Sequence, residues 1–217
     1  RFLYEVYLAA DPAYTGRVTT PVLWDRHSGT IVSNESAEIV RMFNSAFDGV
    51  GARSGDYFPE ALRSEIDALN ERIYASVNDG VYKAGFATTQ AAYEDAVGPL
   101  FETLDWLERR LQAQRYLCGD RLTEADIRLA VTLLRFDLVY FSHFKCNLRR
   151  IADYPSLSGY VRDLYQLPGV AATFDAEHVK RHYYESHRCL NPSGIVPVGP
   201  AIDFAAPHSR GRLTVRG

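Results

Sequence analysis

The sequence contains few cysteines, no excess of basic residues and no long apolar run, and each shortage excludes a class of protein. Three widely spaced cysteines, Cys118, Cys146 and Cys189, do not suit a disulfide framework and favour a reducing compartment, so we expect a cytoplasmic protein. A formal net charge of -3 provides no basic stripe for nucleic acid or for a membrane surface. No apolar run approaches the roughly 20 residues that span a bilayer.

The start of the chain lacks both an initiator methionine and the pattern of a signal peptide. No apolar stretch with a cleavage site follows Arg1-Phe2-Leu3-Tyr4. We therefore expect a truncated or processed start. The remaining composition is that of a globular protein, with 47% hydrophobic and 24% charged residues among 217, which is enough for one or two cores.

Strand patterns are confined to a short region near the amino terminus. Residues 20–25 and 30–32 are rich in β-forming side chains, and Arg26-His27-Ser28-Gly29 separates them, which predicts a hairpin with a four-residue loop. A helix is expected over residues 35–44. We interpret residues 1 to about 17 as the end of an irregular or helical segment.

The rest of the chain has helical periodicity after a break between Asn44 and Phe58, where Gly, Asp and Ser residues predict a domain linker. We divide the chain into a first domain at 1–46, the linker at 47–58, a helical domain at 59–190 and an extended tail at 191–217. Helices are expected from Pro59 to the turn Asn78-Asp79-Gly80, from Thr89 to about Tyr116, from the capping box Thr123-Glu124-Ala125-Asp126 to about Phe141, from Pro155 to Leu164, and from Val170 to His187.

Pro21 stands at the start of the first predicted strand, in Thr20-Pro21-Val22. In a thioredoxin-like fold, a cis-proline at this place turns backbone donors and acceptors toward a bound thiol compound. Only about 5–6% of X-Pro bonds in folded proteins are cis, so a trans edge-strand proline is the commoner explanation of this residue alone. The order of the surrounding elements must decide between the two.

Ser33-Asn34-Glu35-Ser36 lies between the second strand and the following helix. The Ser36 hydroxyl and nearby N–H groups would lie at a helix N-terminus, which attracts a carboxylate, and Glu35 is suited to pair with an ammonium group. Together they predict a receptor for the amino-acid end of a γ-glutamyl peptide. Helix capping explains the same four residues, but strand, proline, strand and then Glu-Ser is the order found in glutathione-binding domains.

Tyr82 follows the predicted helix end at Asn78-Asp79-Gly80 and lies outside any apolar stripe. A phenol in a loop is suited to donate a hydrogen bond to a substrate, and an interface tyrosine with a satisfied hydroxyl is an equal alternative. Tyr183 and Tyr184 on the last predicted helix share this ambiguity. We expect one of the two to face inward and the other outward, and the sequence does not decide which.

Several residue pairs have the spacing of metal ligands, but no Cys-x-x-Cys motif accompanies them, so we expect no metal site. The cysteines are expected to be structural rather than nucleophilic, although Lys145, Arg149 and Arg150 could lower the pKa of Cys146. The pairs are His143 with Cys146, His178 with His182, and His187 with Cys189.

Specific motifs occur at Gly16 to Asp25, Ser33 to Ile39, Gly80 to Thr89, Leu122 to Arg128, His143-Phe144-Lys145-Cys146-Asn147 and Asn191-Pro192-Ser193-Gly194-Ile195. In these motifs the chain resembles the Xi class of glutathione transferases, the glutathionyl-hydroquinone reductases, over essentially its whole length. One departure is Thr19-Thr20-Pro21, where the family usually has Thr-Val-Pro.

This resemblance implies an α+β chain that is predominantly α, with a partial thioredoxin-like domain followed by an all-helical glutathione-transferase C-terminal domain. It implies removal of glutathione from a glutathionyl-hydroquinone, glutathione as co-substrate, and a homodimer. No nucleic-acid or membrane partner is expected. By resemblance, the backbone of Val22, next to Pro21, would bind the peptide part of glutathione, and Glu35 and Ser36 would bind its γ-glutamyl end. The hydroxyls of Tyr82 and Tyr183 would face one pocket and bind the hydroquinone.

The family's nucleophile is a cysteine in a Cys-Pro-Trp motif upstream of the motifs above, and this motif does not occur in the chain. We therefore expect the 217-residue chain to be inactive and a form extended to include the motif to be active. The residues themselves leave two alternatives open. These are a conventional glutathione-conjugating transferase and a non-catalytic transferase-like binding or assembly module.

Overall fold

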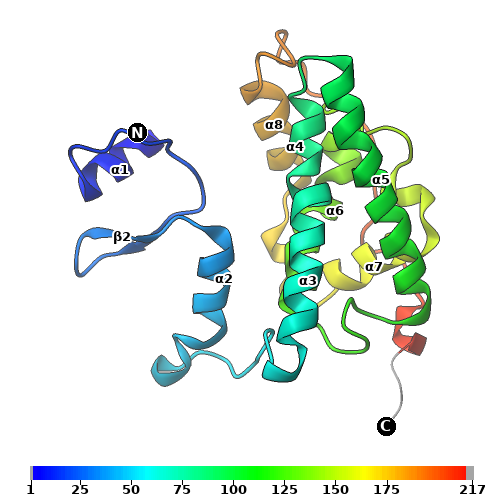
Figure 1. The fold of residues 1–217 in the computed structure, drawn as a ribbon, viewed down its shortest axis with the longest axis horizontal. Helices are drawn as coiled ribbons and strands as arrows, with labels where there is room; N and C mark the ends of the chain where they lie inside the picture. The colour runs from blue at the N-terminus through cyan, green and yellow to red at the C-terminus, as the bar shows by residue number, and fades with distance from the viewer. Residues whose placement is uncertain (1, 214–217) are drawn as a thin grey trace. The chain divides into compact units, whose positions relative to one another are not determined.

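The computed structural model describes residues 2–213 and divides the chain into two compact units, Arg1–Pro59 and Glu60–Gly217. Figure 1 shows a hairpin with flanking helices in the first unit and a bundle of helices in the second. The predicted class, α+β with a large excess of helix, is confirmed. Within the described residues, no helix is both long enough and apolar enough to cross a membrane.

The first unit is built around the predicted hairpin. Strand β1 (Leu23–Asp25) pairs antiparallel with β2 (Thr30–Ser33). The carboxylate of Asp25 accepts the hydroxyl of Ser28 at 2.5 Å and holds the four-residue loop closed. Gly29 ends the loop at a φ of 67°, in the left-handed region that favours glycine.

Helices precede and follow the hairpin. α1 (Leu3–Ala10) shows that the start of the chain is helical, and α2 (Ser36–Ser45) follows within one residue of the predicted range. The Gly- and Asp-rich segment after α2 contains the 3-10 turn η1 (Asp48–Val50). This segment is tied back to α2, because the Asn44 side chain accepts the Tyr57 N–H at 2.7 Å.

The second unit is built from helices and helical turns. Figure 1 shows α3 and α4 end to end beside the long helix α5. In chain order its elements are η2 (Glu60–Leu62), α3 (Arg63–Ile73), η3 (Tyr74–Asn78), α4 (Gly80–Gly85), α5 (Gln90–Ala113), α6 (Glu124–Arg135), η4 (Phe136–Tyr140), η5 (Ile151–Asp153), α7 (Pro155–Tyr165), η6 (Ala171–Thr173), α8 (Ala176–Ser186) and η7 (Arg210–Leu213).

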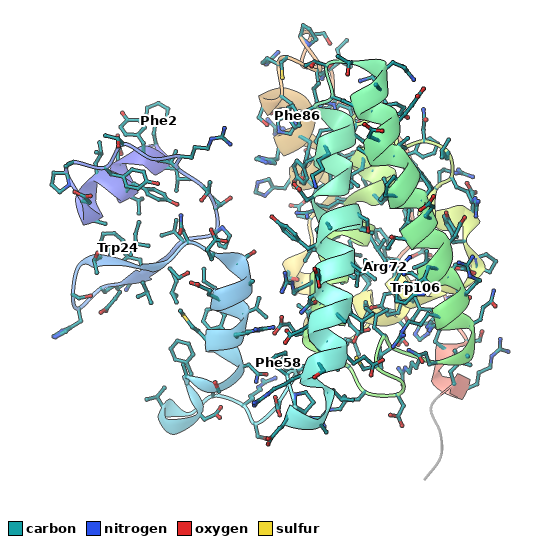
Figure 2. The ribbon with its side chains drawn as sticks, in the orientation of Figure 1. Phe2, Trp24, Phe58, Arg72, Phe86 and Trp106 are labelled. Carbon is teal, nitrogen blue, oxygen red and sulfur yellow. The ribbon has the colours of Figure 1, made fainter. Side chains whose placement is uncertain are left out.

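The core of this unit lies along one face of α5, which packs against α4, η3 and α7. Thr89 caps the helix at the predicted place, because its hydroxyl accepts an N–H of the first turn at 3.2 Å. Arg72 of α3 lies over the ring of Trp106 on α5 at 4.2 Å (Figure 2). The fully buried leucines of α5 recur at spacings of three and four and are Leu100, Leu104, Leu107 and Leu111.

Asp126 joins three segments inside this core. The predicted capping box is confirmed, since one oxygen of Asp126 accepts the N–H and the hydroxyl of Thr123, each at 2.9 Å. The other oxygen accepts the Leu117 N–H at 2.8 Å and the Tyr160 hydroxyl at 2.7 Å. The carboxylate is completely buried, so these bonds replace its water shell and fasten the start of α6 to α7.

The predicted helix end at Asn78-Asp79-Gly80 is wrong. The backbone continues through the π-helical turn η3 directly into α4, so Tyr82 lies on a helix and not in a loop. The Asn78 side chain does not cap locally. It donates to the Arg128 carbonyl at 3.0 Å and to the Thr132 hydroxyl at 2.6 Å, both on α6.

Other boundaries also differ from the prediction. The third helix loses α-helical geometry at Arg135 and continues as the π-helical turn η4. The last helix begins at Ala176 rather than at Val170, because Asp175 caps it by accepting the His178 N–H at 3.0 Å. The coil predicted after Pro192 is interrupted by η7 near its end.

Candidate functional site

The first group of predicted site residues lies on the hairpin unit. The Thr20-Pro21 peptide bond is cis, the alternative that fits a thioredoxin-like fold. Val22 directly precedes β1, and Glu35 and Ser36 are the N-cap and the first residue of α2. Because β1 and β2 pair antiparallel through Leu23 and Ser33, all of these residues lie at one end of the hairpin.

This end of the hairpin has the features of an anion-binding site. The side chains of Glu35 and Ser36 are exposed at the N-terminus of α2, where the helix dipole favours negative charge. The Ser33 hydroxyl accepts the Glu35 N–H at 3.1 Å and donates to Glu38 at 2.9 Å, which orders the turn into the helix. The predicted binding of glutathione by these residues stays a prediction.

Tyr7 of α1 was not predicted as a site residue, yet its hydroxyl holds this end of the hairpin together. It donates to the Thr19 carbonyl at 2.8 Å and accepts from the Asn34 amide at 3.1 Å. The buried tyrosine therefore fixes the loop before Pro21 against the turn before α2. No motif or periodicity marks Tyr7, because its role depends on a tertiary contact.

The second group of predicted residues lies in the helical unit. The hydroxyl oxygens of Tyr82 on α4 and Tyr183 on α8 are 2.6 Å apart, which confirms the expected proximity. A third phenol was missed by the sequence analysis, since Tyr140 in η4 resembles any core aromatic residue. Its hydroxyl lies 2.8 Å from that of Tyr183. We call Tyr82, Tyr140 and Tyr183 the tyrosine cluster.

Burial makes the inner phenols of the cluster harder to ionise. Tyr140 is fully buried and Tyr183 is 4% exposed. Desolvation raises the pKa of Tyr183 to about 12 and raises that of Tyr140 as well. The positive charge of Arg135 opposes both shifts, and its guanidinium carbon lies 5.9 Å from the Tyr140 ring centre. The cluster is thus a chain of linked O–H groups, of which Tyr82 is the most exposed.

Phe144 and Gly85 set the position of the cluster. The Phe144 ring centre lies 5.3 Å from that of Tyr82, 5.4 Å from that of Tyr140 and 5.9 Å from that of Tyr183. α4 approaches this ring at Gly85, where a Cβ atom would lie 2.8 Å from the Phe144 Cβ. Glycine at this position therefore allows the close approach.

The prediction that one of Tyr183 and Tyr184 faces outward is wrong, because both are buried. Tyr184 is 6% exposed, its hydroxyl is hydrogen-bonded to that of Ser142, and its ring centre lies 4.5 Å from that of His143. The segment after η4 that carries Ser142 and His143 covers the face of α8 beside the tyrosine cluster. Tyr183 therefore belongs to the cluster, and Tyr184 anchors α8 to that segment.

Two histidines beside the cluster form an imidazole pair. Nε2 of His143 lies 3.3 Å from Nδ1 of His187. Burial, together with the nearby His187 and Lys145, lowers the pKa of His143 to about 4. His143 is therefore neutral at neutral pH, and the pair links the segment after η4 to the end of α8.

Two of the cysteines are poorly placed to act as nucleophiles. Cys118 and Cys146 are buried, and burial raises the pKa of both thiols, that of Cys146 to about 12. The suggestion that basic neighbours lower the pKa of Cys146 is wrong, because desolvation outweighs the opposing effect of Lys145. Cys189 is exposed. Within residues 2–213 there is no group of at least three His, Cys, Asp or Glu side chains that could hold a metal ion.

Comparison with known proteins assigns the chain to a family. Residues 90–163 match the model of the glutathione S-transferase C-terminal domain. Glutathionyl-hydroquinone reductase PcpF of Sphingobium chlorophenolicum is 62% identical over 200 residues, which cover 92% of this chain and 64% of PcpF. Glutathionyl-hydroquinone reductase YqjG of Escherichia coli is 59% identical over 209 residues, which cover 96% of this chain and 64% of YqjG. The chain thus spans 64% of the length of these curated relatives.

Solved structures agree with this assignment. The glutathione-bound structure of YqjG matches with a TM-score of 0.95 and 58% identity, covering 97% of this chain and 68% of that one. Glutathione transferase Xi 1 from Trametes versicolor matches with a TM-score of 0.90 and 53% identity, covering 94% of this chain and 72% of that one. The chain therefore belongs to the Xi class of glutathione transferases.

Proposed function

We propose that the protein containing this chain reduces glutathionyl-hydroquinones to hydroquinones, with glutathione as the second substrate. The observation that carries the proposal is the tyrosine cluster, in which the Tyr183 hydroxyl lies 2.6 Å from that of Tyr82 and 2.8 Å from that of Tyr140. The names of the relatives PcpF and YqjG, at 62% and 59% identity, support the same activity.

The tyrosine cluster suits a quinol in two ways. Its linked hydroxyls offer donors and acceptors to the two hydroxyl groups of a hydroquinone ring. The pKa of Tyr183, which burial raises to about 12, leaves this phenol protonated at neutral pH, as an ordinary tyrosine is, so that it can deliver its proton to a ring carbon that carries negative charge. Tyr82, which is more exposed than Tyr183 and hydrogen-bonded to it at 2.6 Å, then relays a proton from water to Tyr183.

The proposed reaction consists of two displacements at sulfur. A protein thiolate attacks the sulfur of the conjugate, the carbon–sulfur bond breaks, and the electron pair stays on the ring carbon, which Tyr183 protonates to give the hydroquinone. A glutathione thiolate then attacks the mixed disulfide of protein and glutathione, which releases oxidised glutathione and restores the protein thiolate. Burial raises the pKa of Cys118 and Cys146, which leaves Cys189 as the exposed thiol. Because the Cys-Pro-Trp motif that the resemblance implies does not occur in these 217 residues, we assign the thiolate to a cysteine outside them.

Glutathione is proposed to bind at the end of the hairpin next to Pro21. The backbone of Val22 would pair with the peptide, the Ser36 hydroxyl and the N-terminus of α2 would bind the γ-glutamyl carboxylate, and Glu35 would bind the ammonium group. Tyr7 would hold the two halves of this site in register. We further propose that the protein acts in the cytoplasm, as a homodimer and without a metal.

Release of hydroquinone from its glutathione conjugate tests the proposal. The full-length protein and the 217-residue chain are assayed side by side at saturating glutathione. We expect turnover by the full-length protein and none by the chain alone. In the full-length protein, Tyr183→Phe should lower kcat by about 100-fold, the usual size of a lost proton donor, with little change in the KM for glutathione.

Tyr184→Phe is the matched control, because it removes a neighbouring buried hydroxyl that bonds Ser142 and lies outside the tyrosine cluster. We expect it to keep most of kcat. Wild-type turnover by the Tyr183→Phe protein would contradict the role of the cluster. Conjugation of glutathione to an electrophile without release of hydroquinone would instead identify a conventional conjugating transferase.

A further inference from the structure

A cavity of about 330 Å³ lies among residues of α5, α7 and the carboxyl-terminal segment. Arg162 of α7, Arg210 and Arg212 of η7, and His208 line it, and none of its described lining residues is an aspartate or a glutamate. We call it the arginine cavity. It is separate from the tyrosine cluster, with which it shares no lining residue.

Arg210 is a buried cation that lacks a carboxylate partner within residues 2–213. The side chain is 5% exposed, and its Nη2 atom donates to the carbonyl oxygens of Leu111, Gln114 and Arg115 at 3.1, 2.7 and 2.7 Å. These carbonyls lie at and just beyond the C-terminal end of α5, where the helix dipole is negative. They hold the guanidinium in place but supply no full opposite charge, which a buried cation ordinarily requires.

Two nitrogen atoms of the cavity's arginines are buried and unpaired. In the described part of the chain, four buried side-chain nitrogen or oxygen atoms lack a hydrogen-bond partner, and two of them are the Nε atoms of Arg162 and Arg210. A buried donor without an acceptor lowers stability, so such atoms are rare and call for an explanation. Both atoms belong to arginines of one cavity, which adds unsatisfied donors to a described lining without acidic side chains.

Asp163 and Glu108 favour the charged form of Arg210, but their oxygen atoms are hydrogen-bonded to other groups. Asp163 accepts two hydrogen bonds from Arg115, each at 2.8 Å, and lies 3.6 Å from His208. Glu108 accepts the N–H groups of Ser156 and Leu157 at the start of α7. The positive charge of the cavity lining is therefore left for a ligand.

We propose that the arginine cavity binds a phosphate group, either as inorganic phosphate or as part of a small phosphomonoester. Guanidinium groups match the geometry of phosphate oxygens and form paired, charge-assisted hydrogen bonds with them. Arg162 and Arg212 would bind the phosphate oxygens directly, and the buried Arg210 would add positive charge without contacting them. The volume of about 330 Å³ leaves room for an organic group beside the phosphate. This inference does not rest on the proposed hydroquinone reductase activity.

Calorimetric titration of the 217-residue chain tests the proposal. Inorganic phosphate and phenyl phosphate are titrated separately, with sodium chloride at equal ionic strength as the blank. We expect saturable binding of phosphate at one site and none of chloride. Tighter binding of phenyl phosphate would identify a phosphomonoester as the ligand, and weaker binding would identify free phosphate. A modest site has a Kd of about 1 mM. If neither inorganic phosphate nor phenyl phosphate binds saturably at concentrations up to about 10 mM, well above that Kd, the proposal is overturned.

Arginine variants locate the binding. The double variant Arg162→Gln, Arg212→Gln should weaken phosphate binding at least about tenfold, since each substitution removes charge-assisted hydrogen bonds to the phosphate. Arg181→Gln on α8 makes the same kind of substitution, with the loss of one positive charge, at an arginine that does not line this cavity, and should bind phosphate like the wild type. Wild-type affinity in the double variant would contradict the assignment. Arg210 is left unchanged because its bonds to the end of α5 support the fold.

A second variant decides the question even if the double variant does not fold. Ser209→Glu places a carboxylate in the lining of the arginine cavity, where it can pair with the guanidinium groups. We expect it to abolish phosphate binding and to raise the unfolding temperature in the absence of phosphate. Unchanged phosphate binding together with an unchanged unfolding temperature would overturn the proposal.

Discussion

The hairpin unit and the helical unit bury their apolar side chains to very different extents. Among residues 2–59, the buried apolar residues are Tyr7, Ile39 and Pro59, whereas Phe2, Phe43 and Val50 are 69%, 57% and 79% exposed. In the helical unit, α3, α5, α6 and α7 each contribute several buried apolar side chains to a common core. Because burial of apolar surface is the main stabilising term, the helical unit should carry most of the stability.

The same contrast applies to polar groups. Asp25 at the end of β1 and Asp126 in the helical core both accept hydrogen bonds from neighbouring N–H and hydroxyl groups. Asp25 is partly exposed, whereas Asp126 is fully buried. Loss of a hydrogen bond at the surface costs little stability, because water takes the place of the lost partner. Loss of one in the core costs more, because the buried donor is then left without any partner. Burial, more than the number of hydrogen bonds, therefore separates the two units.

Hydrogen exchange should reveal the largest difference between the units. In the 217-residue chain, amides of β1 and β2 should exchange at least about a thousandfold faster than those on the buried face of α5, because local opening of a two-stranded hairpin exposes little apolar surface. Exchange is followed by mass spectrometry of peptides from each unit. Equal protection of the two segments would contradict the comparison.

Removal of Asp126 should give the next largest effect. Asp126→Ala leaves the N–H groups of Leu117 and Thr123 and the hydroxyl of Tyr160 without a partner in the core, and should lower the free energy of unfolding by about 3 kcal/mol. Asp25→Ala is the matched control in the hairpin and should cost less than about 1 kcal/mol. A cost for Asp25→Ala as large as that for Asp126→Ala would break the comparison.

Urea unfolding of each unit can be followed through its own tryptophan. Trp24 and Trp106 are the only tryptophans of the chain and lie one in each unit (Figure 2). Fluorescence in a Trp24→Phe background reports on the helical unit, and fluorescence in a Trp106→Phe background reports on the hairpin unit. The aspartate variants are measured in the background that reports on their own unit.

A methyl group at Gly85 should destabilise the helical unit by about 2 kcal/mol, because it overpacks the contact with Phe144. The matched control is Gly98→Ala on α5, where a Cβ meets no atom within 4 Å. This change should stabilise the unit by about 0.5 kcal/mol, since alanine favours the helix over glycine. Urea unfolding with Trp106 as the reporter measures both. A neutral Gly85→Ala would show that the Phe144 contact can relax.

Acid should weaken the helical unit through His143, and the effect of a change of one pH unit is the smallest of the series. Its pKa is lowered from 6.5 to about 4 in the folded state, so the stability from its neutral form is present above pH 6.5 and is lost as the pH falls toward 4. The expected loss is about 1 kcal/mol per pH unit in that range. His143→Gln should flatten this dependence. An unchanged slope in the variant would assign the acid sensitivity to other groups.

The sequence by itself determined the elements whose causes are local. The hairpin over residues 20–32, the start of α2 at Ser36 and the capping box at Thr123 to Asp126 follow from turn chemistry and from side chains that bond backbone groups a few residues away. The leucine stripe of α5 follows from the 3.6-residue period. The roles assigned to Tyr82 and Tyr183 came from the resemblance to a family, since no local pattern marks them.

Only the tertiary structure decided which of these groups meet. Asn78 reaches α6 rather than ending its own helix, Tyr140 joins the tyrosine cluster, and Tyr184 is buried along with Tyr183. Desolvation, which depends on how much protein surrounds a thiol, reversed the expected pKa shift of Cys146. The physical reason is one of range: hydrogen bonds along a helix or turn join residues close in sequence, whereas burial and contact between distant side chains depend on which faces of the helices pack together.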